Sequence, residues 1–116
     1  ARQQVVERYG RAFAGKLTTP FVEEGCVSAW AQYALLAADT AQRDKIVAHL
    51  KEAGIPNMIY YPTPQHALPV FRDEPHYGET FRNADDYCAR TFSLPMHPYL
   101  EQAEQRQIID AVLEAL

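Results

Sequence analysis

Residues 40–61 read TAQRDKIVAHLKEAGIPNMIYY, and they predict a helix, a tight turn and a short strand in succession. The helix is expected over residues 41–53, because apolar side chains recur there at the spacing of one helical face. That face comprises Ile46, Val47 and Leu50. Gly54 fits the left-handed residue that ends many helices, and Pro56 prevents the helix from resuming. Residues 57–61 carry the aromatic and branched side chains typical of a strand.

The segments on either side continue this alternation of helices and strands. We expect helices over residues 1–14, 84–91 and 101–116, strands over residues 27–38 and 92–94, and loops over residues 15–25 and 62–78. The last helix has a clear apolar stripe, formed by Ile108, Ile109, Val112, Leu113 and Leu116. Three short strands with helices between them predict an α+β fold, a two-layer sandwich of a small three-stranded sheet with about four helices.

The composition fits one globular domain and argues against several kinds of partner. The 116 residues are 47% hydrophobic and 22% charged, which is enough apolar material for a core. The net charge is -4 and no basic cluster interrupts it, so no nucleic acid partner is expected. The longest apolar run, residues 34–38, is too short to span a bilayer. Cys26 and Cys88 make no disulfide framework, which indicates reduced thiols in a cytoplasmic protein.

The histidines and cysteines do not form a recognisable metal or nucleophile motif. Zinc ligands are usually paired at short spacings, and none of the four histidines fits such a pair: His49, His66, His76 and His97. We therefore expect no metal site. A nucleophilic cysteine with a distant histidine stays open as a weak alternative, since sequence does not show which side chains are neighbours.

The segment Tyr60-Tyr61-Pro62-Thr63-Pro64-Gln65-His66 is the candidate binding region. Two aromatic hydroxyls and an imidazole lie where a strand enters a loop stiffened by prolines. Such side chains suit a sugar ring or a base, because they combine stacking with hydrogen bonds. The residues alone favour equally a second interpretation, in which the tyrosines alternate between core and surface and His66 is solvated.

Five segments in order carry a family resemblance: RQQVVERY (2–9), SAWAQY (28–33), LKEAGIP (50–56), YYPTPQH (60–66) and NADDYCARTFSLPMHP (83–98). Together they resemble the C-terminal small domain of the DegT/DnrJ/StrS-type sugar aminotransferases, over nearly the whole chain. The last segment is the most specific of the five. The resemblance implies that residues 1–116 form that domain. The first helix has no capping residue, and we expect the chain to begin inside the helix that joins the two domains of these enzymes.

The resemblance implies an enzyme that uses pyridoxal phosphate. Members are fold-type I homodimers that transfer an amino group, usually from glutamate, to a keto group of a nucleotide-activated sugar. The catalytic lysine and the cofactor contacts belong to the large domain, which is absent from residues 1–116. We therefore expect no catalytic residue, no bound cofactor and no activity in this chain alone. None of its lysines has a setting suited to a Schiff base: Lys16, Lys45 and Lys51.

The same resemblance assigns substrate contacts to the loop after the second strand. Tyr60 and Tyr61 are the implied contacts with the nucleotide-sugar, and His66 lies in the same loop. Many members have His-Tyr-Pro where this chain has Tyr60-Tyr61-Pro62, so Tyr61 matches better than Tyr60. The chain is similar to members that aminate UDP-linked 3-keto hexuronates for O-antigen and lipopolysaccharide synthesis. Two alternatives remain open: a stand-alone module that binds a sugar nucleotide or peptide, and a small metal or thiol enzyme.

Overall fold

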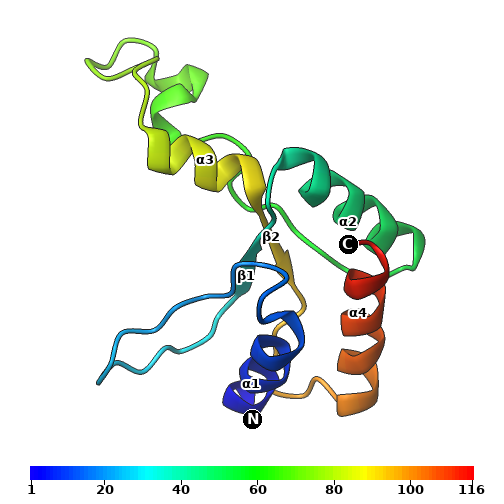
Figure 1. Cartoon of the computed structure of the whole chain (residues 1–116). Helices are drawn as coiled ribbons and strands as arrows, with labels where there is room; N and C mark the ends of the chain where they lie inside the picture. The colour runs from blue at the N-terminus through cyan, green and yellow to red at the C-terminus, as the bar shows by residue number, and fades with distance from the viewer.

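The structure is a computed structural model that describes all 116 residues, Ala1 to Leu116. It has four α-helices, a two-stranded sheet and two 3-10 helices (Figure 1). Their bounds are α1 Arg2–Phe13, β1 Tyr33–Leu36, α2 Thr40–Glu52, η1 Gln65–Ala67, η2 Pro69–Phe71, α3 Arg82–Arg90, β2 Thr91–Leu94 and α4 Gln102–Glu114. None of the helices combines the length and the apolar composition that a membrane span requires. The α+β class and the four helices are confirmed, and the predicted helix boundaries agree within two residues.

The turn after α2 forms as the sequence predicts. Gly54 has a φ of +70°, the left-handed conformation that glycine adopts without steric cost. The N–H of Gly54 donates to the Lys51 carbonyl at 3.1 Å, and that of Ile55 donates to the Leu50 carbonyl at 2.8 Å. These bonds satisfy carbonyls at the end of the helix, so the chain reverses before Pro56.

The sheet has two strands where three were predicted. Strand β1 pairs with β2 in antiparallel register, from Tyr33 opposite Leu94 to Leu36 opposite Thr91. Residues 57–61 contribute only one bridge, in which Met58 pairs with Ser93. The predicted strand over these residues is therefore wrong in extent.

The bridge between Met58 and Ser93 is not extended on either side. Met58 and Ser93 exchange two hydrogen bonds, of 3.1 and 2.8 Å. In an antiparallel ladder the next hydrogen-bonded pair on this edge sets Pro56 opposite Pro95. Neither proline has an N–H to donate, so the ladder ends there on this side. On the other side the chain bends at Tyr60, and no backbone hydrogen bond joins Tyr60 to Thr91.

The predicted strand over residues 27–38 shortens to four residues, Tyr33–Leu36. On the free edge of β1, Thr18 and Leu36 exchange two hydrogen bonds of 3.0 Å. The next pair would set Pro20 opposite Ala34, and Pro20 has no N–H. Trp30 has a φ of +51°, which is unusual for a bulky residue and interrupts an extended chain.

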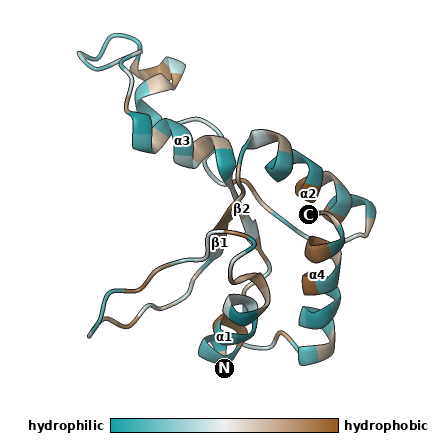
Figure 2. Cartoon of the chain, in the orientation of Figure 1, coloured by the Kyte–Doolittle hydropathy of each residue, from teal (hydrophilic) through white to brown (hydrophobic).

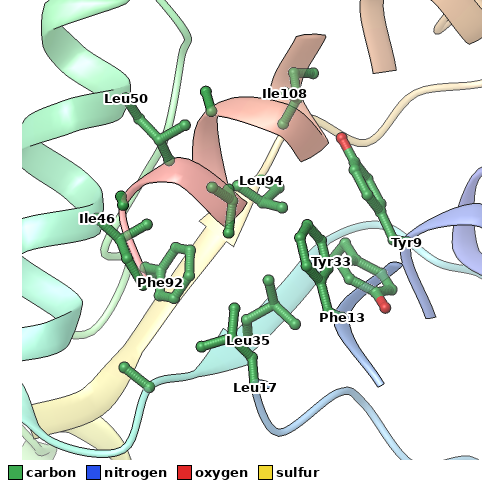
Figure 3. Packing of buried hydrophobic residues seen from close by; sticks show 14 of the residues in the cluster. Tyr9, Phe13, Leu17, Tyr33, Leu35, Ile46, Leu50, Phe92, Leu94 and Ile108 are labelled. Atoms are coloured by element: carbon green, nitrogen blue, oxygen red, sulfur yellow. The ribbon is translucent and has the colours of Figure 1, made fainter. Parts of the chain in front are cut away.

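The core lies where the sheet meets α1, α2 and α4. Figure 3 shows Phe92 and Leu94 of β2 close to Ile46 and Leu50 of α2, with Ile108 of α4 nearby. On the β1 side the core is aromatic: Tyr33 packs against Tyr9, with ring centroids 4.9 Å apart. Burial raises the pKa of the Tyr33 hydroxyl to about 12. Burial, and then the neighbouring Tyr33, also raise the pKa of Tyr9, while Arg8 opposes the rise.

Two segments leave this body as projecting arms (Figure 1). The first arm is residues 19–32, between α1 and β1, and the second arm is residues 62–81, which lead into α3. The radius of gyration is 15.6 Å, whereas a compact chain of this length has about 13 Å. Both arms carry hydrophobic positions, shown in brown in Figure 2. Phe21 of the first arm is 82% exposed. The arms therefore display apolar side chains that the body does not cover.

Candidate functional site

Tyr60 lies at the edge of the sheet, two residues beyond the bridge between Met58 and Ser93. Because that bridge ties the segment to β2, the backbone that carries Tyr60 is held against the body. Its side chain is 48% exposed and borders a hollow of about 200 Å³. The other residues of this hollow are Ala31, Gln32, Pro56, Asn57, Met58, Ser93, Leu94, Pro95 and Met96. We call it the sheet-edge hollow.

The sheet-edge hollow combines apolar walls with a few polar groups. Met58 and Met96 supply flexible thioether surface, which adapts to ligand shape. The polar side chains are those of Gln32, Asn57 and Ser93, together with the Tyr60 hydroxyl. Such a lining suits a ring that stacks on Tyr60 while its hydroxyls form hydrogen bonds.

Tyr61 is on the same loop but does not border the sheet-edge hollow. Its side chain is 65% exposed. The structure therefore leaves Tyr61 available on the surface beside the hollow.

His66 is turned toward α3 and not toward Tyr60. Its Nε2 lies 3.0 Å from Oδ1 of Asp85, and its side chain is only 14% exposed. The other carboxylate oxygen of Asp85 accepts the Phe81 N–H at 3.0 Å, and the Phe81 ring contacts the imidazole edge-on at 4.7 Å. The His66 carbonyl also accepts the Gly78 N–H at 3.2 Å. These contacts form a clasp that fastens the two ends of the second arm together.

The sequence interpretation missed several residues of the sheet-edge hollow. Ser93 is a polar residue between two apolar ones in β2, and that alternation is the signal that marks it. Met96 lies within the most specific of the resembling segments. Gln32 also lies within a resembling segment, residues 28–33, and it precedes β1, whose pairing with β2 brings it to the hollow.

The lysines of the chain lie away from the sheet-edge hollow. The three lysines are exposed, and none borders the sheet-edge hollow: Lys16, Lys45 and Lys51. No three side chains of histidine, cysteine, aspartate or glutamate come together as metal ligands. A larger hollow, of about 870 Å³, lies between the first arm and β1, but its lining is mostly apolar and contains no lysine or histidine.

A known protein family matches nearly the whole chain. Residues 1–113 match the model of the DegT/DnrJ/EryC1/StrS aminotransferase family. The chain therefore belongs to this family.

Two curated relatives show what the match covers. The chain is 33% identical, over 112 residues, to UDP-2-acetamido-2-deoxy-3-oxo-D-glucuronate aminotransferase of Pseudomonas aeruginosa, covering 96% of this chain and 30% of the relative. It is 31% identical to dTDP-4-dehydro-2,3,6-trideoxy-D-glucose 4-aminotransferase of Saccharopolyspora spinosa, covering 99% of this chain and 29% of that one. The chain thus spans less than a third of the length of these relatives.

Solved structures agree with the fold. A DegT DnrJ EryC1 StrS aminotransferase from Brucella abortus superposes with a TM-score of 0.85 at 34% identity, over 97% of this chain and 30% of that one. DesV of S. venezuelae, solved with a ketimine intermediate, superposes with a TM-score of 0.88 at 26% identity, over the same shares of the two chains. The arms and the short sheet therefore belong to a known domain architecture.

Proposed function

We propose that residues 1–116 form the C-terminal domain of an aminotransferase that uses pyridoxal phosphate. The enzyme would transfer an amino group from glutamate to a keto group of a nucleotide-activated sugar. The observation that carries this proposal is the family match over residues 1–113, nearly the whole chain. The chain would begin inside the inter-domain helix, with the cofactor-binding domain outside these residues.

In this proposal the chain supplies one wall of the substrate site. Tyr60 stacks on the sugar or base from the sheet-edge hollow, and Tyr61 reaches the same ligand from the surface beside it. His66, the third predicted contact, is engaged by Asp85, and we propose that it serves the site by fixing the loop. Positioning of the substrate by one domain leaves the chemistry to the cofactor held by the other.

We extend the proposal to the identity of the sugar. A UDP-linked 3-keto hexuronate is favoured because the Pseudomonas relative is named for a 3-oxo-glucuronate linked to UDP. In this proposal the amino sugar serves O-antigen and lipopolysaccharide synthesis, and the enzyme acts in the cytoplasm. The whole enzyme would act as a homodimer.

Substitutions in the enzyme that contains these residues test the proposal. We expect Tyr61→Ala to raise the KM for the nucleotide-sugar by about tenfold, since a lost aromatic contact costs about 0.5–1.5 kcal/mol and a hydrogen bond is lost with it. The half-reaction with glutamate should be unchanged. Tyr99→Ala is the control, because Tyr99 is 85% exposed and lies between β2 and α4, outside the loop that carries Tyr60 and Tyr61. An equal effect of both variants would contradict the assignment.

A stand-alone binding module is the less favoured function. The sheet-edge hollow has about 200 Å³, below the roughly 300–1,000 Å³ usual for small-molecule sites. We therefore expect little or no binding when a UDP-sugar is titrated into the 116-residue chain and followed by NMR. Saturable binding at micromolar concentration would favour the module. Mixing the chain with pyridoxal phosphate should give no absorbance band of a lysine-bound cofactor.

A further inference from the structure

A second hollow, apart from the proposed substrate site, lies between α1 and α4. Its volume is about 360 Å³, and none of its residues borders the sheet-edge hollow. The lining is polar and basic: Arg8, Arg11, Ala12, Gln102, Gln105, Arg106, Ile109 and Asp110. Three arginines thus converge from two helices that are distant in the sequence.

A buried glutamine holds one of these arginines in place. Gln105 has 0% exposure, although glutamine is seldom fully buried. Its Nε2 donates to the Val5 carbonyl at 2.8 Å, which fixes the amide. Its Oε1 accepts a hydrogen bond from Nε of Arg8. The Arg8 guanidinium is therefore oriented before any ligand arrives, and pre-orientation lowers the entropy cost of binding.

The arginines of this hollow have no carboxylate partner in the chain. Ion pairs within 4.0 Å form at three other arginines, Arg43, Arg72 and Arg90. No such pair forms at Arg8, Arg11 or Arg106, and the terminal nitrogens of Arg8 have no hydrogen-bond acceptor. Asp110 is the one acidic residue of the lining, so the hollow keeps an excess of two positive charges. This excess stands out in a chain with a net charge of -4.

We propose that the hollow between α1 and α4 binds a phosphate group of a small molecule. Guanidinium groups present paired N–H donors that match phosphate oxygens, and such bonds are stronger than neutral ones. A phosphate monoester carries about 1.5 to 2 negative charges at pH 7, which matches the excess charge of the lining. The site is independent of the proposed function, because it needs neither Tyr60 nor a keto sugar.

A titration of the 116-residue chain with inorganic phosphate tests this site. The arginine Nε–Hε signals are followed by NMR at constant ionic strength, with sodium chloride as the balancing salt. We expect saturable shifts at Arg8, Arg11 and Arg106 and none when chloride alone is varied. We expect Arg106→Gln to weaken phosphate binding by about tenfold, as the loss of one charged hydrogen bond implies. Arg106 is exposed, so the variant should keep the dispersed spectrum of the folded chain.

A matched variant distinguishes a specific phosphate site from general electrostatic attraction between phosphate and arginine. Arg2→Gln removes the same charge from the exposed start of α1, outside the hollow, and should leave the phosphate affinity unchanged. Arg11→Gln provides a second change inside the hollow, on the other helix, should Arg106→Gln disturb the fold. Shifts that do not saturate, or equal weakening by Arg2→Gln and the hollow variants, would show solvated arginines and overturn the proposal.

Discussion

The body of the molecule buries its apolar side chains, whereas the two arms leave many of theirs exposed. In the body, α1, α2, α4 and the sheet bury aromatic and aliphatic residues completely, as at Tyr9, Leu35 and Phe92. In the arms, residues of the same kind stay exposed: Phe21 is 82% exposed, Val27 95% and Val70 79%. The body is therefore held by its own packing, whereas the arms depend on a few hydrogen bonds and ring contacts.

The stability of the chain depends mainly on the body, whereas the arms offer surface for binding. A body with a closed core can fold around its own contacts, and local changes in the arms should cost it little. The arms carry apolar surface without a partner in the chain, as binding surfaces often do. Tyr60 and Tyr61 lie where the body meets the second arm, so they combine a fixed backbone with exposed rings.

Truncation of a core ring should give the largest effect. Phe92 has 0% exposure, and Phe92→Ala is expected to lower the free energy of unfolding by about 3–5 kcal/mol. The same truncation in the first arm, Phe21→Ala, should change it by less than about 0.5 kcal/mol. Urea unfolding followed by circular dichroism measures both. Comparable losses would mean that the first arm packs as part of the core.

Alkaline pH should give the second largest loss of stability, through the buried tyrosines of the body. Unfolded tyrosines ionise near pH 10, whereas burial raises the pKa of Tyr33 to about 12 and raises that of Tyr9 also. Above pH 10 the unfolded chain releases protons that the folded chain keeps, so stability is full below pH 10 and is lost toward pH 12. Urea unfolding at about pH 9 and about pH 11 measures this loss, which Tyr33→Phe should reduce. If the variant loses as much free energy of unfolding between these two pH values as the unchanged chain, groups other than Tyr33 cause the loss.

Two glycines test whether the backbone of the body is more constrained than that of the first arm. Gly54 ends α2 in the body with a φ of +70°, and Gly25 turns the first arm with a φ of +81°. A Cβ at either position would meet nothing within 4 Å, so only backbone strain is at issue. We expect Gly54→Ala to cost about 1 kcal/mol and Gly25→Ala less, because the arm can relax. Equal losses in thermal unfolding would show that the arm is as constrained as the body.

The clasp of the second arm should give the smallest change in global stability. Asp85→Ala removes the partner of His66 and the acceptor of the Phe81 N–H. Arg72 is the single trypsin site within the second arm, and we expect its cleavage to become severalfold faster while urea unfolding changes little. Asp110→Ala is the control, since Asp110 is exposed on α4, outside the second arm. Equal cleavage in both variants would show that the clasp does not hold the arm.

The elements of this protein follow from local sequence signals. The helices were predicted within two residues because their apolar periodicity and end signals are local, as at Gly54. The strand over residues 92–94 was also predicted nearly correctly, since β2 is Thr91–Leu94. The expected strands over residues 27–38 and 57–61 were too long, because their lengths depend on which residue lies across the sheet.

The α+β class and the helices follow from the sequence alone, because they depend on residues close together. The family follows from it as well, because it depends on motifs that occur in a fixed order. The number of strands depends instead on tertiary contacts: residues 57–61 meet β2 only at the bridge between Met58 and Ser93, so the sheet has two strands. The tertiary structure also turned His66 toward Asp85, and it set Arg8 beside Gln105, 97 positions away. Contacts of this kind form between segments whose separation along the chain carries no local signal. They arise from packing of the whole core, which brings distant side chains to one place.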